Sequence, residues 1–204
     1  HQADLVGISL CSKIGKACYI PDGHKSSNCL NKKSVVDKLK NLLEDPSIKI
    51  IGQNIKFDYI VFYKLGISLS SMEDTMLMSY VLDAGKNRHN MDILSEIHLN
   101  HKTISFKDLV GTGKKEINFS DVDVEKAKDY AAEDADITLR LYNVLAPMLK
   151  EKPNQEKLLH DIEYPLVHVL SRVEQNGAKI DKKKLAKHSK ELGLTIDDLS
   201  SQAY

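Results

Sequence analysis

One acid of this sequence falls on an apolar helix face, where a carboxylate needs a partner. Over residues 122–149, helical spacing brings Ala127, Ala131 and Leu141 onto one stripe, and Asp134 lies on the same stripe. An unpaired charge in apolar surroundings costs several kcal/mol, so such a group either stays protonated or is paired. A divalent cation would satisfy Asp134. A hydroxyl group or a buried arginine is the alternative, and for an isolated acid it is the commoner one.

Tyr130 lies one helical turn before Asp134, so both side chains share a face of this helix. A hydroxyl group and a carboxylate are thereby placed together. Glu133, Asp136 and Arg140 fall outside the apolar stripe, and we expect them on the solvated side.

A second acid follows a short apolar run at 48–51 that is typical of a buried strand. Asn54 is expected to cap a helix over 54–64, which puts Asp58 one turn inside that helix on the same face. Ligands of α/β sheets bind off the carboxyl ends of strands, so Asp58 is well placed for a site. The alternative is a solvated first-turn acid that favours the helix dipole.

The spacing of apolar residues predicts the elements that must position these side chains. They are a hairpin over 4–10 and 17–20, a helix over 34–43, the strand at 48–51, and helices over 54–64, 73–83, 90–99, 121–149, 155–176 and 182–201. This order predicts an α/β fold with a C-terminal helical extension. Proline disfavours helix in the residue before it, so Pro153 predicts a boundary between residues 1–152 and 153–204.

Composition narrows the class of protein. Lys+Arg and Asp+Glu both total 29, so DNA binding would have to be local rather than driven by an overall positive charge. The 3 cysteines lack zinc-site spacing and do not indicate a disulfide framework. No signal peptide or membrane-length apolar run is recognised, and we expect a cytoplasmic protein.

Two strings carry a family resemblance. GQNIKFD at 52–58 contains Asn-xxx-Asp after an apolar strand, and YAAEDAD at 130–136 contains Tyr-xxx-Asp. In this order they resemble the second and third motifs of the four-carboxylate 3′-5′ exonucleases. With RHNMD and HKTISF, they resemble the proofreading domain of family A (bacterial polymerase I-type) DNA polymerases, and 162–181 resembles the start of the polymerase domain. The resemblance covers the chain from about Asp4 to the C-terminus. It implies a ribonuclease H-like exonuclease fold, a mixed sheet flanked by helices, for residues 1–152, and a protein associated with the bacterial nucleoid.

The resemblance also implies a reaction, the hydrolysis of 3′-terminal nucleotides of DNA with two divalent cations. Asp134 and Asp58 would each hold a cation, either Mg²⁺ or Mn²⁺ with Zn²⁺ as an alternative, and Tyr130 would orient the attacking water. The partners would be a single-stranded 3′ end and a polymerase domain in the same parent chain. The residues matching positions that grip DNA are Gln53, Asn54, Phe57, Arg88, Met91 and Phe106. By residue type alone, the aromatic ones and Met91 would more often be core.

The family's first motif, Asp-x-Glu on a strand, would lie upstream of His1, and its two acids are absent from this sequence. We therefore expect the chain as given to bind metal weakly and to have little nuclease activity. That strand is central in the family, between the strands at 4–10 and 48–51, so we expect a gap or a substitute strand there. The alternatives are a catalytically silent module that binds DNA or scaffolds a polymerase, and a ribonuclease of the same superfamily, against which the helical extension argues.

Overall fold

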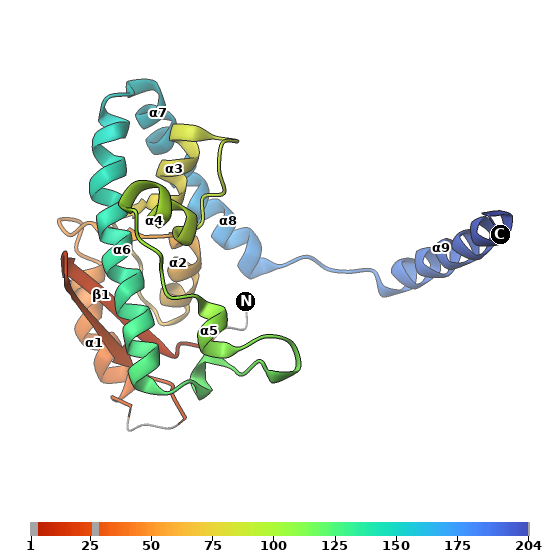
Figure 1. Cartoon of the computed structure of the whole chain (residues 1–204), viewed down its shortest axis with the longest axis horizontal. Helices are drawn as coiled ribbons and strands as arrows, with labels where there is room; N and C mark the ends of the chain where they lie inside the picture. The colour runs from red at the N-terminus through yellow and green to blue at the C-terminus, as the bar shows by residue number, and fades with distance from the viewer. Residues whose placement is uncertain (1–3, 26–28, 204) are drawn as a thin grey trace.

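The structure is a computed structural model that describes residues 4–25 and 29–203, apart from the side chain of Lys114. Its body is built around one long helix, α6 (Val124–Lys150), which packs on the hairpin, on α3 and on α4 (Figure 1). Asp123 caps α6, since its Oδ1 accepts hydrogen bonds from the backbone N–H groups of Glu125 and Lys126. This helix carries Tyr130 and Asp134, so the hairpin and the other helices are arranged around them.

The strands form two separate pairs. β1 (Gly7–Lys13) and β2 (Lys16–Pro21) are antiparallel, and β3 (Ile50–Gly52) runs parallel to β4 (Met72–Asp74). The hairpin is confirmed, with its first strand shifted three residues along the chain and its second strand longer than predicted, and Gly15 supplies the positive φ of its tight turn. Among the described residues β1 does not pair with β3. The sheet is therefore interrupted between the segments that we expected to flank a central strand.

The helices agree with the apolar spacing within a few residues, with three differences. The α-helices are α1 (Lys32–Leu43), α2 (Ile55–Lys64), α3 (Thr75–Asp83), α4 (Met91–Leu99), α5 (Phe106–Val110), α6, α7 (Pro153–Leu158), α8 (Tyr164–Asn176) and α9 (Lys182–Ala203). Residues 73–74 belong to β4 instead of starting a helix, and α5 was not predicted. The predicted helix 155–176 is interrupted by a π-helical turn, Leu159–Glu163.

Two large apolar clusters hold the body together, and a smaller third cluster, with Val110 and Ala127, joins α5 to α6. One lies among α3, α4 and α6, and includes Leu94, Leu141 and Leu145, each no more than 1% exposed. The other joins α1, α2 and β3 and includes Ile55 at 1% exposed. Burial of this kind contributes roughly 1.5–3 kcal/mol per large aliphatic side chain, so the clusters fix how α2 and α6 are held.

Helix α8 packs onto the same body. Its Val167 lies in the cluster that contains Ile55. The Tyr164 hydroxyl donates to Glu73 Oε2 over 2.7 Å and accepts from the Asp74 backbone N–H over 3.3 Å. The first part of the helical extension is therefore joined to β4, at the end of the β3–β4 sheet.

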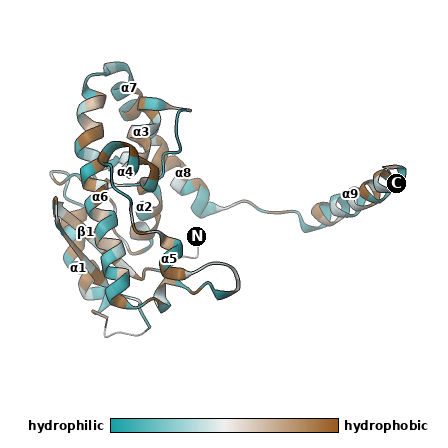
Figure 2. Ribbon diagram, in the orientation of Figure 1, coloured by the Kyte–Doolittle hydropathy of each residue, from teal (hydrophilic) through white to brown (hydrophobic). Residues whose placement is uncertain are grey.

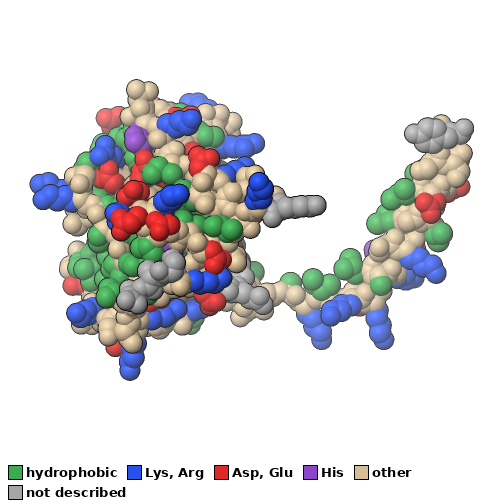
Figure 3. All heavy atoms as spheres, turned by 60° about the horizontal axis from the view of Figure 1, so that its bottom comes forward, with side chains coloured by type: hydrophobic (Ala, Val, Ile, Leu, Met, Phe, Trp, Pro, Cys, Tyr) green, Lys and Arg blue, Asp and Glu red, His purple; other side chains and the backbone are tan. Residues whose placement is uncertain are grey.

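Helix α9 differs from all of these. It lies away from the body beyond an extended segment, and none of its residues is buried (Figure 1). Hydrophobic and hydrophilic residues alternate along it, and its hydrophobic side chains stand open on the surface (Figures 2 and 3). Leu185, Leu192 and Leu194 are each more than 60% exposed. Within the described ranges, no helix is long and apolar enough to cross a membrane.

Candidate active site

An open groove of about 1180 Å³ runs between the two sheets. Its walls come from β1, β3, α2 and α6, with aromatic side chains at Phe57, Phe106 and Phe119. Asp58 from α2 and Asp134 from α6 both line it. The two acids that the sequence singled out thus face one cavity from different helices. We call this cavity the central groove.

Asp134 is less exposed to solvent than Asp58. Its Oδ1 is shielded from solvent and has no hydrogen-bond partner among the described residues. Burial raises the pKa of Asp134 to about 7; the Tyr130 hydroxyl opposes this, while the charges of Glu133 and Asp92 add to it. Burial and the nearby Asp134 carboxylate likewise raise the pKa of Tyr130. Tyr130 and Asp134 therefore interact with each other, while Oδ1 of Asp134 remains without a hydrogen-bond partner among the described residues.

Asp58 keeps more than a third of its surface open because the central groove beside it is wide. Crowding of its carboxyl by protein atoms nevertheless raises its pKa to about 7, and the charge of Asp74 adds to this. An acid in that position holds its proton more readily than a solvated acid. A cation would favour the charged form of Asp58 and Asp134 alike.

Asp74, which sequence reasoning missed, holds the start of α2. It is 1% exposed, and its carboxylate accepts hydrogen bonds from the backbone N–H groups of Asn54 (3.0 Å), Ile55 (2.9 Å) and Met76 (2.9 Å). Asn54 stands at the N-cap position of α2 but makes no side-chain cap hydrogen bond, because its backbone is left-handed (φ 60°). The predicted capping role of Asn54 is therefore wrong, and Asp74 fills it.

Three aromatic rings gather beside Asp134. The ring centroid of Phe106 lies 5.9 Å from those of both Phe119 and Tyr130, and Phe119 lies 6.1 Å from Tyr130. Phe106 is 46% exposed, which leaves a ring face open toward the central groove. Phe119 was not singled out in the sequence, since a lone phenylalanine in a loop carries no pattern.

The other predicted DNA-contact residues have different surroundings. Phe57 is 51% exposed on the groove wall, and Arg88 is exposed between α3 and α4. Met91 lines the groove and also packs against the α3–α4–α6 cluster. The Gln53 side chain donates to the backbone carbonyl of His89 over 2.8 Å and accepts from the Thr75 hydroxyl. Gln53 thus braces the segment beside Arg88.

Glu133 and Asp136 correct the expectation that they lie on the solvated side of α6. Their side chains are only 19% and 15% exposed. Asp136 Oδ1 accepts a hydrogen bond from the Gly15 backbone N–H over 2.6 Å, and Oδ2 accepts from Arg140 Nε over 2.7 Å. Both carboxylates accept hydrogen bonds from neighbouring segments, because α6 packs against protein on more than one side. Their long-range partners left no signal in the local spacing.

The donor set agrees with divalent cations but does not complete a site. Mg²⁺ and Mn²⁺ prefer oxygen ligands, and the partnerless Oδ1 of Asp134 is one such oxygen. Within residues 4–25 and 29–203, no group of 3 or more potential ligands comes together. Asp58 and Asp134 therefore form part of a ligand set.

The relatives of this chain decide the family. A family model described as 3′-5′ exonuclease, of the DNA polymerase A type, matches residues 1–150. The chain belongs to the DNA polymerase A 3′-5′ exonuclease family. The chain is 44% identical over its whole length to DNA polymerase I of Pseudomonas aeruginosa, and 40% identical to that of Rhizobium leguminosarum. It spans 23% and 22% of those two proteins.

Solved structures share the fold of this chain. The POL domain of Pol1 from M. smegmatis, in complex with DNA primer-template and dNTP, aligns with a TM-score of 0.66. Identity is 20%, and the alignment covers 93% of this chain and 29% of that one. Brucella melitensis NrnC aligns with a TM-score of 0.59 at 19% identity, over 80% of this chain and 72% of its own. These likenesses agree with the ribonuclease H-like exonuclease fold predicted from the sequence.

Proposed function

We propose that this chain is the proofreading unit of a DNA polymerase, which hydrolyses 3′-terminal nucleotides of DNA in the central groove. The observation that carries the proposal is the Tyr130–Asp134 pair: Asp134 lines the same groove as Asp58, and its buried Oδ1 has no hydrogen-bond partner among the described residues. Family membership supports it. The polymerase domain would be the partner in the same parent chain, with residues 1–152 as the exonuclease domain and 153–204 as the start of the polymerase domain.

The side chains would divide the work between them. Asp58 and Asp134 would hold the divalent cations, Mg²⁺ or Mn²⁺, which supply positive charge beside the scissile phosphate. Tyr130 would orient the attacking water, because its hydroxyl lies against Asp134. The single-stranded 3′ end would be gripped by Gln53, Asn54, Phe57, Arg88, Met91 and Phe106, with the exposed ring faces of Phe57 and Phe106 available for stacking.

We further propose that the central groove takes the Asp-x-Glu strand implied by the family resemblance. β1 and β3 both line the groove, and among the described residues each pairs only with a strand on its other side. A strand seated there would satisfy both edges and would carry its side chains toward α2 on one face and α6 on the other. It would bring the acids that Asp58 and Asp134 lack.

The test compares this chain alone with this chain preceded by a segment that carries the Asp-x-Glu motif implied by the family resemblance. The substrate is a single-stranded DNA with a labelled 3′ end, with Mn²⁺ or Mg²⁺. We expect slow or no hydrolysis by the chain alone and a cation-induced rise in melting temperature of less than about 1 °C, since weak binding adds little stability. The extended chain should hydrolyse DNA from the 3′ end.

Variants of the extended chain assign the reaction to this groove. Asp134→Asn should lower the hydrolysis rate about 100-fold or more, the order that a positioned catalytic group supplies. Tyr130→Phe should lower it about 10-fold or more, as expected for a residue that supports a ligand. Glu125→Gln, on the same helix but 76% exposed, is the matched control. Hydrolysis that survives Asp134→Asn, or a marked preference for RNA, would contradict the proposal.

A further inference from the structure

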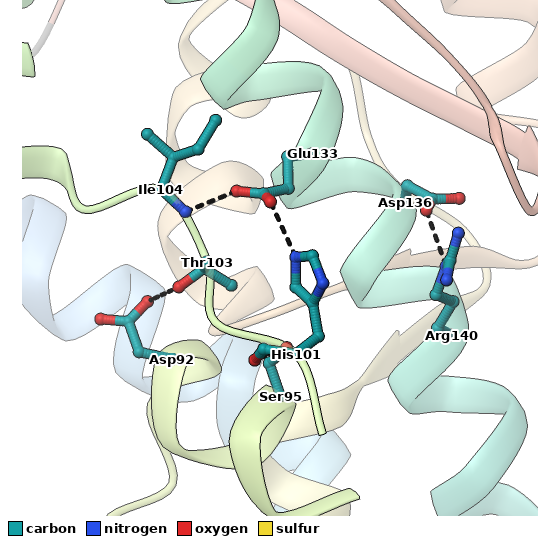
Figure 4. Close-up of polar contacts among 8 residues, drawn as sticks. All are labelled: Asp92, Ser95, His101, Thr103, Ile104, Glu133, Asp136 and Arg140. Atoms are coloured by element: carbon teal, nitrogen blue, oxygen red, sulfur yellow. Dashed lines mark hydrogen bonds and ion pairs between the residues drawn. The ribbon is translucent and has the colours of Figure 1, made fainter. Parts of the chain in front are cut away.

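The carboxylate next to Asp134 in the sequence holds the segment that leads into α5 (Figure 4). Glu133 Oε2 accepts a hydrogen bond from the Ile104 backbone N–H over 2.6 Å, and Oε1 lies 2.8 Å from Nε2 of His101. Both oxygens thus bind residues 101–105, which we call the connector. A single side chain of α6 therefore fixes two points of the connector, from 29 and 32 residues away in sequence.

Helix α4 holds the connector from another side (Figure 4). The fully buried Ser95 hydroxyl donates to the His101 carbonyl over 2.9 Å, and the Thr103 hydroxyl donates to Asp92 Oδ1 over 2.7 Å. These bonds tie the connector to α4 but not to α6. Among these contacts, those of Glu133 come directly from the helix that carries Tyr130 and Asp134. The bonds to α4 hold the connector to α6 only indirectly, through the apolar cluster that α4 shares with α6.

Phe106 follows the connector directly and begins α5. Its ring centroid lies 5.9 Å from that of Tyr130, and the ring lines the central groove. Val110 of α5 packs with Ala127 of α6 in an apolar cluster, so the end of α5 stays on α6 without the connector. The first turn of α5 would lose its anchor if the connector left α6, and Phe106, which begins α5, would lose its fixed distance to Tyr130. The geometry of this aromatic edge thus depends on a carboxylate that need not touch DNA.

We propose that Glu133 is a positioning residue of the exonuclease site, which holds the connector on α6 and so keeps Phe106 beside Tyr130, where the terminal base of a DNA 3′ end stacks. This inference rests on the proposed function, because it requires DNA in the central groove. Glu133 acts through the connector, whereas Asp134 faces the groove itself. Its role therefore shows in the binding of the 3′ end more than in the turnover of bound DNA.

The test uses the extended chain described above, with the Asp-x-Glu segment, and a short single-stranded DNA with 2-aminopurine at its 3′ end. Glu133→Ala should speed hydrogen exchange at the Ile104 amide about 10-fold or more, since a hydrogen bond worth about 1.4 kcal/mol is lost. It should also weaken the quenching of 2-aminopurine and raise KM about 10-fold, with a smaller change in kcat. Glu133→Gln keeps an acceptor for the Ile104 N–H and should restore most of both. Glu125→Ala, which removes an exposed acid of α6, is the control.

Each outcome bears on a different step. Unchanged Ile104 exchange in Glu133→Ala would overturn the clamp itself. Faster exchange with unchanged quenching and KM would show that Glu133 is structural only and would overturn the positioning role. If the unsubstituted chain neither quenches 2-aminopurine nor hydrolyses DNA, the proposed function fails and the role of Glu133 fails with it. A fall in melting temperature equal in the Ala and Gln variants, without rescue by Gln, would also count against it.

Discussion

Two regions of the molecule each contain a carboxylate on an apolar background. One is the junction of β4 with α2 and α3, and the other is the wall of the central groove. The two carboxylates differ in their hydrogen bonding. At the junction, Asp74 is 1% exposed and accepts hydrogen bonds from three backbone N–H groups. At the groove wall, Asp134 has a shielded oxygen without a partner among the described residues. Burial raises the pKa of both, so burial alone does not separate them.

The difference lies in what each carboxylate completes. The oxygens of Asp74 accept hydrogen bonds from N–H groups at the starts of α2 and α3 that have no partner within those helices. The hydrogen-bonding capacity of Asp74 is therefore used by the protein itself. Asp134 lines the central groove and keeps an oxygen without a hydrogen-bond partner among the described residues. A buried acid with every oxygen occupied thus indicates structure, whereas an unpartnered oxygen beside a groove indicates a ligand.

Replacing Asp74 should have the largest effect on stability. Asp74→Ala leaves three N–H groups, of which that of Ile55 is buried, without their acceptor, and we expect a loss of about 3 kcal/mol in the free energy of unfolding. Urea unfolding followed by circular dichroism measures it. Asp83→Ala, at the exposed end of the same helix, removes only the pair with Lys86 and should cost less than about 0.5 kcal/mol. Equal effects of the two variants would remove the contrast drawn above.

The stability of the metal-free chain should fall as pH rises from about 4 to 7. The unfolded chain ionises Asp58 and Asp134 near the ordinary value of 3.8, whereas the folded chain holds both protons until a pKa of about 7. Unfolding is therefore favoured across this window, and the effect levels off above it. Urea midpoints measured from pH 4 to 8 check this, and Asp134→Asn should flatten the curve. A steeper curve in Asp134→Asn would contradict it.

Asp134→Asn should change stability little at pH 8, in contrast to Asp74→Ala. It removes an ionised group with an unpartnered oxygen, so the free energy of unfolding should stay within about 1 kcal/mol or rise. Thermal unfolding without added metal measures it. A loss as large as that of Asp74→Ala would mean that Asp134 is a structural acid.

Removing residues 178–204 should have the smallest effect. No residue of α9 is buried, so its loss removes no core contact, and the free energy of unfolding should change by less than about 0.5 kcal/mol. Ending the chain at residue 158 instead would remove Leu159 and Val167 from the two clusters and should destabilise it by several kcal/mol. Similar melting temperatures for the two truncated chains would show that α8 does not contribute to the body.

The helices were predictable because their apolar residues repeat with the helical period, which survives in any context that buries one face. β4 was not, since a run of three residues carries no period and Asp74 resembles the start of a helix. Tyr130, Asp134 and Asp58 could be found because local spacing places them on faces and because two motifs in order resemble a family. The roles of Asp74 and Glu133 depend on contacts about 20 to 32 residues away, which local spacing cannot report.

The strand edges along the central groove affect how the chain aggregates. β1 and β3 line it, and among the described residues each has a hydrogen-bonded neighbour on only one side. Such edges are templates on which strands of other molecules can add. β1, with 7 residues against 3 in β3, offers the longer template. In concentrated solution this chain should therefore aggregate slowly, because strands of other molecules add to the edge of β1 while the helices of the body remain folded.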